Sequence, residues 1–227
     1  MAASNSAQIH PDDLIGLPRV GTDETGKGDY FGDLVVAGVY LDATTEPLAA
    51  ELGVQDSKKL TDARAHAIAR DIREAFPFEV VRISPEKYNE LYEKMNNLNR
   101  LLAWAHARVI ENLLPRCEAD LVVSDQFGNA ALLENALMGG ARRVRLVQIT
   151  KGERDLAVAA ASIIARATFL QRLEALSREY DFSLPKGATH VLPAGCQLYR
   201  QGGIPLLRKV AKLHFKTTQQ IVDRCKR

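Results

Sequence analysis

The chain has 227 residues, of which 46% are hydrophobic and 26% are charged, the proportions of an ordinary globular protein with a real core. These figures exclude a disordered or fibrous chain, and they favour one α/β domain over several. The formal net charge of +2 excludes a protein that attracts nucleic acid through its overall charge, although a local basic region is still possible.

The N-terminal 18 residues are polar and small at first and then contain Pro11 and Pro18. We expect a loosely attached leader over residues 1–18 and one domain over residues 19–227. The leader lacks the basic-then-apolar layout of a signal peptide, and no run approaches the roughly 20 continuous apolar residues of a membrane span. These features predict a protein without a membrane partner.

The three cysteines are odd in number and widely spaced, at Cys117, Cys196 and Cys225. This spacing excludes a disulfide framework and the paired-cysteine motif of a zinc site. A reducing compartment suits such a chain. We therefore predict a cytoplasmic location.

The first half of the domain begins with glycines and continues with the β-branched run at residues 35–41, which has the length of a strand. This order predicts a hairpin with a tight, glycine-rich turn. Thr61 is typical of a helix start, and the helix should reach about Phe76 because Pro77 stops it. Residues 78–83 alternate and predict a further strand.

The second half starts at Pro85 with one long helical region over residues 86–114, where apolar residues recur in steps of three and four. Short apolar runs predict strands at 121–124 and 144–149, and an alanine-rich helix follows at about 156–180. The last helices are expected at 205–212 and 217–225. Strands and helices that interleave after a hairpin predict an α/β fold, with a mixed sheet flanked by helices and with C-terminal helices.

The densest acidic signal is the pair Asp23-Glu24 within a glycine-rich segment. Adjacent side chains on a strand point to opposite faces, so two neighbouring carboxylates inside a sheet need a compensating positive charge. A hard divalent cation such as Mg²⁺ takes oxygen ligands and meets this need. Taken alone, the pair is more typical of a glycine-rich turn with surface acids than of a metal site.

Two further acids follow predicted strands. Asp125 stands where the run 121–124 ends, the position at which open α/β sheets present functional groups, although a turn or helix cap would also explain it. Glu153 precedes the alanine-rich helix, where the helix dipole by itself favours acids. Because all three acidic positions follow strands or lie in turns, we favour one shared site over three separate structural roles.

Basic residues offer candidate phosphate contacts in two places. Lys58 and Lys59 could reach phosphates as point charges or could belong to a charged surface loop. Between Arg200 and Arg227 there are eight Lys/Arg against the single acid Asp223. Such a tail attracts phosphates by counterion release, but charge runs are often solvated helix faces.

Together these segments resemble the type 2 ribonucleases H, the HII/HIII family, over most of the chain from Val20 onward. Any one segment is weak, but five in this order are specific. They are Gly21 to Gly32 with Asp23-Glu24, Asp56-Ser57-Lys58-Lys59-Leu60, Ser124-Asp125-Gln126-Phe127, Lys151-Gly152-Glu153, and Ala160-Ala161-Ser162-Ile163-Ile164-Ala165-Arg166.

Within this family the details resemble ribonuclease HIII more than HII. The similar segments are Gly28-Asp29-Tyr30-Phe31-Gly32, Tyr88-Asn89, Asn96 to Asn99, Trp104-Ala105-His106, Leu184-Pro185-Lys186-Gly187-Ala188 and Ala211-Lys212-Leu213-His214-Phe215. The HII enzymes carry Gly-Arg-Gly after the first acids, whereas this chain has Gly26-Lys27-Gly28. The HIII enzymes usually carry a separate N-terminal substrate-binding domain, and about 18 residues precede the core here. The basic tail is then the candidate source of hybrid affinity.

The resemblance implies a ribonuclease H-like fold and a metal-dependent endonuclease that hydrolyses the RNA strand of RNA–DNA hybrids with two Mg²⁺ or Mn²⁺ ions. It places the catalytic carboxylates at Asp23, Glu24, Asp125 and Glu153, with the first three as metal ligands. Asp155 is the alternative fourth acid. The substrate backbone would meet Gly26, Lys27, Gly28, Lys58 and Lys59. We expect a monomer.

Three other functions stay open from the sequence, and the first two are the main alternatives. The first is cleavage at single ribonucleotides embedded in duplex DNA, as in ribonuclease HII, which the Gly26-Lys27-Gly28 triplet puts in doubt. The second is a domain that binds hybrids without cutting them, and the retained carboxylates argue against it. The third, a nuclease of the same broad fold that ignores the 2′-hydroxyl, would also cleave plain DNA.

Overall fold

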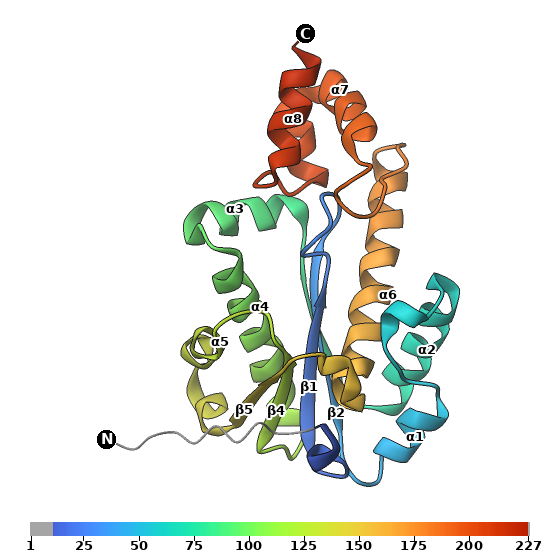
Figure 1. The fold of residues 1–227 in the computed structure, drawn as a ribbon, viewed down its shortest axis with the longest axis vertical. Helices are drawn as coiled ribbons and strands as arrows, with labels where there is room; N and C mark the ends of the chain where they lie inside the picture. Colours follow the sequence, from blue (N-terminus) through green and yellow to red (C-terminus); the bar gives the residue numbers. More distant parts are fainter. Residues whose placement is uncertain (1–10, 227) are drawn as a thin grey trace.

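The computed structural model describes residues 11–226. At its centre is a five-stranded sheet in the order β3-β2-β1-β4-β5 (Figure 1). The strands are β1 (Arg19–Thr25), β2 (Leu34–Leu41), β3 (Phe78–Ile83), β4 (Leu121–Asp125) and β5 (Arg145–Ile149). The first three pair antiparallel, while β4 runs parallel to β1 and β5 runs parallel to β4. The predicted α/β fold with a mixed sheet is confirmed.

Helices cover both faces of the sheet (Figure 1). One face carries α1 (Glu46–Glu51), α2 (Asp62–Ala75) and the long α6 (Leu156–Glu179), and the other carries α3 (Pro85–Met95), α4 (Leu98–Leu113) and α5 (Ala130–Ala136). The pair α7 (Leu192–Val210) and α8 (Lys216–Cys225) stands at one end of the molecule. Short 3₁₀ turns lie at Pro11–Leu14, Ser57–Lys59, Leu114–Arg116, Gly139–Arg143 and Gly152–Arg154.

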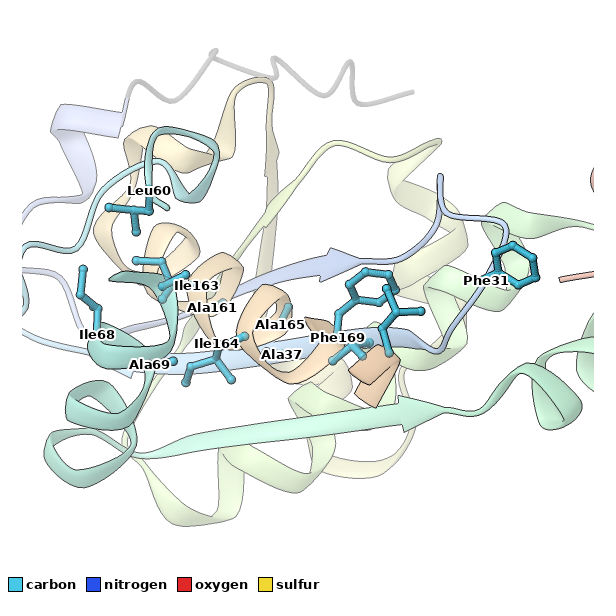
Figure 2. Close-up of a cluster of buried hydrophobic side chains, with 14 of the residues drawn as sticks. Phe31, Ala37, Leu60, Ile68, Ala69, Ala161, Ile163, Ile164, Ala165 and Phe169 are labelled. Carbon is cyan, nitrogen blue, oxygen red and sulfur yellow. The ribbon is translucent and has the colours of Figure 1, made fainter. Parts of the chain in front are cut away.

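The largest core cluster lies between the sheet and α6, and it includes much of α2. Figure 2 shows Ala161, Ile164, Ala165 and Phe169 of α6 in this cluster beside Ala37 of β2. The approach is so close that a Cβ on Gly21 would lie 2.2 Å from the carbonyl carbon of Ala157. Small residues on both elements therefore allow α6 to pack directly against β1.

Within residues 11–226, α6 is the one helix that is long and apolar enough to cross a membrane. Two thirds of its apolar stretch (67%) is buried inside the protein. Its apolar surface already packs on the sheet and α2, as expected for a core helix.

The expected helix over residues 86–114 is wrong, because the structure has two helices there. Asn96 takes a left-handed conformation (φ 47°), which ends α3, and the Asn97 side chain accepts a hydrogen bond from the Arg100 amide to start α4. Asparagine tolerates both roles better than other non-glycine residues. The apolar spacing continues across this break, and that continuity concealed it.

Helix α7 is also longer than expected. The predicted helix at 205–212 is the end of α7, which begins at Leu192 and bends at Gly203 (φ 61°) just before Pro205. The predicted helix at 217–225 agrees with α8 to within one residue. Two short helices, α1 and α5, have no counterpart among the predicted elements.

The hairpin between β1 and β2 is confirmed, but its connection is not a tight turn. Residues 26–33 form the loop, which we call the glycine loop. Its backbone bonds to the C-terminal unit, by which we mean α7, α8 and the segment between them. The Gly32 amide donates to the Val210 carbonyl at 2.9 Å. The loop is long because it is held by distant segments, a contact that local sequence does not reveal.

Part of the expected leader lies in the structure. Residues 11–14 form a 3₁₀ turn, and Leu14 is buried beside Leu121, Val123 and Val158. Residues 1–10 lie outside the described chain, so the expected loose attachment there stays a prediction.

Candidate active site

The strand order brings the predicted acids to one edge of the sheet. Strands β1, β4 and β5 are parallel, so their carboxyl ends meet there. The pairing of β1 with β4 ends at Thr22 and Ser124, so Asp23 and Glu24 extend beyond this pairing. A cavity of about 450 Å³ opens at this point, lined among others by Asp23, Glu24, Asp125 and Glu153.

Asp23 and Glu24 turn to opposite faces of the sheet, as neighbours on a strand must. Asp23 lies on the α6 side, where it takes a hydrogen bond from Ser162. Glu24 lies on the α4 side, with Oε2 3.1 Å from His106 Nε2. Both still line the cavity because the strand ends there.

His106 was not among the predicted site residues. Its ring is fully buried, with Nδ1 3.0 Å from Thr22 Oγ1 and with Phe127 stacked on it at 4.7 Å. The ring contacts Glu24 from within the core, and His106 is not among the residues that line the cavity. The apolar spacing of α4 places His106 on the buried face of that helix, but the sequence does not show that this face contacts β1.

The two adjacent acids have opposite pKa shifts. Burial raises the pKa of Asp23, and the nearby carboxylates of Glu24 and Asp125 raise it further. Burial also acts to raise the pKa of Glu24, but the hydrogen bond from His106 and the Lys27 ammonium outweigh it and lower that pKa to about 2. Asp23 is thus the acid whose negative charge is least compensated.

Asp125 and Glu153 are brought together by a turn after β5. The Gly152 amide donates to Asp125 Oδ1 at 2.9 Å, and a Cβ on Gly152 would lie 2.9 Å from the Asp125 Cα. Lys151 takes a left-handed conformation (φ 57°) to make this approach. The turn therefore sets Glu153 at the cavity and leaves Asp125 Oδ2 free of that bond.

Asp155, the alternative fourth acid, has a different place. It is buried, accepts from Arg19 Nε at 2.6 Å and caps α6 by accepting from the Val158 amide at 3.0 Å. Arg19 Nη2 also donates to Glu46 Oε1 at 2.5 Å. Glu153 lines the cavity and Asp155 is not among its lining residues.

The predicted substrate residues lie on the rim of the same cavity, with one exception. Gly26, Lys27, Gly28 and Lys58 line it, whereas Lys59 is exposed beside it. Gly26 has φ 97°, a conformation that side chains rarely adopt.

Arg166 of α6 also lines the cavity and was missed as a site residue. It donates to the Ser57 carbonyl and to Asp62 Oδ1, the latter at 2.7 Å. These bonds fasten the segment that carries Lys58 to the core helix. Arg166 was visible in the sequence only as the end of the alanine-rich motif.

The donor set suits a hard cation, since it consists of carboxylate oxygens. Among residues 11–226, no group of three His, Cys, Asp or Glu side chains could hold a metal ion as it stands. Lys27 Nζ lies 2.5 Å from Glu24 Oε1 and interacts with Asp23 and Asp125. An ammonium group therefore takes the position where a cation would neutralise these acids, and moving this exposed side chain would free Glu24 Oε1.

Two residues of the basic tail already have partners within the protein, which the sequence alone did not indicate. Lys212 is fully buried, and Arg208 pairs with Glu93 at 2.7 Å. The other lysines and arginines of the tail that the structure describes are exposed.

Comparison with known proteins identifies the family. The family model described as Ribonuclease HII matches residues 20–218. The chain belongs to the type 2 ribonuclease H family. It is 43% identical to a ribonuclease HIII of Protochlamydia amoebophila, over 95% of this chain and 72% of that one. It is 46% identical to a ribonuclease HIII of Chlamydia pneumoniae, over 90% and 70%.

Among type 2 ribonuclease H structures, Bst-RNase HIII in complex with Mn²⁺ is similar, with a TM-score of 0.88 and 34% identity. The match covers 95% of this chain and 72% of that chain. The expected family and its HIII-like character are confirmed.

Proposed function

We propose that this type 2 ribonuclease H is an endonuclease that hydrolyses the RNA strand of RNA–DNA hybrids and needs Mg²⁺ or Mn²⁺. The observation that carries the proposal is the convergence of Asp23, Glu24, Asp125 and Glu153 on one cavity. The weakly compensated charge at Asp23 supports a cation there. The Mn²⁺ complex of Bst-RNase HIII supports the same choice of cofactor.

In this proposal Asp23, Glu24 and Asp125 hold the metal, and Glu153 flanks them. When bound, a pair of cations would lower the pKa of the attacking water and stabilise the leaving 3′ oxygen. His106 and the Gly152 amide keep Glu24 and Asp125 oriented. Positions fixed by such neighbours need no rearrangement at the moment of reaction.

The glycine loop and the lysine segment bind the substrate in this proposal. Apart from its two chain neighbours, no residue has an atom within 4 Å of where a Cβ on Gly28 would be, so a sugar–phosphate backbone can approach its peptide closely. Lys27 and Lys58 lie on the cavity rim, and Lys59 is exposed next to it. Contacts with the 2′-hydroxyl at this rim would distinguish RNA from DNA.

The test is cleavage by the purified protein of three matched duplexes with Mg²⁺ or Mn²⁺. They are a continuous RNA–DNA hybrid, a DNA duplex with one embedded ribonucleotide, and plain DNA. We expect cleavage of the hybrid. Preference for the single ribonucleotide would support the HII-like activity instead, cleavage of DNA would contradict dependence on the 2′-hydroxyl, and binding without turnover would support a noncatalytic role.

Replacement of Asp125 tests the site within this assay. Asp125→Asn should abolish cleavage and leave the fold intact, because the amide keeps the shape but loses the charge that binds a cation. Asp120→Asn is the matched control, since Asp120 is an exposed acid just before the same strand. Near-normal activity of Asp125→Asn in either metal would contradict the site.

We also propose that the protein acts as a cytoplasmic monomer. Its three cysteines are free thiols in the structure, which suits a reducing compartment. Sedimentation equilibrium should give the mass of one chain, 25.0 kDa. A mass near twice that value would contradict the monomer.

A further inference from the structure

Lys212 has an unusual environment for a lysine. It is fully buried, and its ammonium donates to the carbonyls of Gly32 at 2.6 Å, Asp29 at 2.9 Å and Phe31 at 3.5 Å. Burial lowers its pKa to about 7, while the charges of Asp29 and Asp33 oppose that change. Three carbonyl oxygens of one loop therefore surround the end of one distant side chain.

The segment that carries Lys212 is fastened to the same loop through its backbone. The Lys212 amide donates to the Tyr30 carbonyl at 2.8 Å, and Phe31 forms an antiparallel bridge with Ala211. Asn89 of α3 holds the segment from the other side, donating to the Ala211 carbonyl at 2.8 Å and accepting from the Leu213 amide at 2.9 Å. The ammonium is thus presented to the loop by a rigid frame.

The anchored end of the glycine loop touches the end that lines the cavity. A Cβ on Gly26 would lie 2.2 Å from the Asp33 carbonyl oxygen, so the two backbones are in direct contact. Phe169 of α6 packs beside both Gly26 and Gly32. A shift of the carbonyls at 29–32 would therefore move Gly26 and its neighbours.

We propose that Lys212 is a positioning residue that sets the shape of the glycine loop for substrate binding. The inference rests on the proposed function, in which Gly26, Lys27 and Gly28 contact the substrate. Lys212 itself cannot contact a phosphate, because no part of it is exposed. The C-terminal unit then contributes to hybrid binding by shaping the loop, as well as by any charge attraction of its exposed lysines.

The test compares Lys212→Met with Lys94→Met, which removes a lysine charge from an exposed position on α3. We expect Lys212→Met to raise KM for the hybrid by about tenfold and to change kcat by less than about twofold, since a displaced binding loop costs affinity. The slope of log kcat/KM against log salt should not change, because no phosphate contact is lost. Lys94→Met should match the wild type.

Hydrogen exchange gives a readout that is independent of cleavage. The amides of Tyr30 and Gly32, which bond to the carbonyls of Gly187 and Val210, should exchange faster in Lys212→Met than in the wild type. Lys212→Gln keeps a donor for part of the carbonyl set, so it should lie between the two in both KM and exchange. If Lys212→Met does not fold, Lys212→Gln is used in its place for both measurements.

Three results would overturn the inference. They are an unchanged KM with unchanged exchange in the folded variant, a loss in kcat with KM unaffected, and a lower salt slope. A wild-type protein that fails to cleave the hybrid would contradict the proposed function instead, and loop exchange would still decide the role of Lys212.

Discussion

The two ends of β1 hold acidic clusters with very different bonding. At the start of the strand, Arg19 donates to both Asp155 and Glu46, and all three residues are buried. At the other end, the ion pairs within the described chain involve Glu24, through Lys27 and His106. Asp23 accepts hydrogen bonds from the Ser162 hydroxyl and the Glu24 amide instead.

This difference separates a structural cluster from a functional one. A buried carboxylate is tolerated when it is paired and hydrogen-bonded, as at Arg19. A buried carboxylate that stays charged without such a partner lowers the stability of the fold. Such carboxylates occur mainly at sites that bind cations or catalyse reactions. One end of β1 therefore carries the Arg19 cluster, which stabilises the fold, and the other end carries Asp23 and Glu24, which are suited to binding a cation.

The largest effect is expected from Arg19→Met. This change leaves Asp155 and Glu46 buried without their partner, so the free energy of unfolding should fall by about 3–5 kcal/mol. Urea denaturation measures it. The control is Arg70→Met, whose pair with Asp71 is on the surface with the arginine side chain 71% exposed, and which should cost less than about 1 kcal/mol. Equal effects would remove the distinction between the two clusters.

The second prediction separates neighbours at the turn after β5. Glu153→Gln should lower kcat by about tenfold or more, or about 1.4 kcal/mol of barrier, and leave the melting temperature unchanged. Asp155→Asn should do the reverse, because it weakens the bond to Arg19 and costs about 1.5–3 kcal/mol of stability. Calorimetry and hybrid cleavage on the same two samples measure both. If folded Asp155→Asn lost cleavage and Glu153→Gln did not, Asp155 would be the fourth catalytic acid instead of Glu153.

The smallest effect is a pH dependence at Asp23. Its folded-state pKa is raised from 3.8 to about 7, so the folded state holds this proton more tightly than the unfolded state. Its contribution to stability is therefore full below about pH 4 and is lost as pH rises through about 7. In EDTA, the free energy of unfolding of Asp23→Asn should exceed that of the wild type at pH 8, and the difference should shrink as the pH falls to 5. A variant that is less stable at pH 8 would show that the charge at Asp23 is compensated.

Most of the sheet could be predicted from local sequence. The β-branched run of β2, the alternation in β3 and the short apolar runs of β4 and β5 each carry their own signal. The break at Asn96 was missed because helical periodicity continues across it, and α7 was shortened because Pro205 is also typical of a helix start. These errors concern backbone conformation at single residues, which long-range packing decides.

The sequence by itself indicated the family, the order of the five strands and the acids Asp23, Glu24, Asp125 and Glu153, which line one cavity, since residue types and their spacing are local properties. The tertiary structure decided which of these charges are compensated. It placed Asp155 on Arg19 and His106 on Glu24, and it buried Lys212 of the basic tail under the glycine loop. Compensation of charge depends on what lies within a few ångströms in space, and those partners are 136, 82 and 180 residues away in the chain.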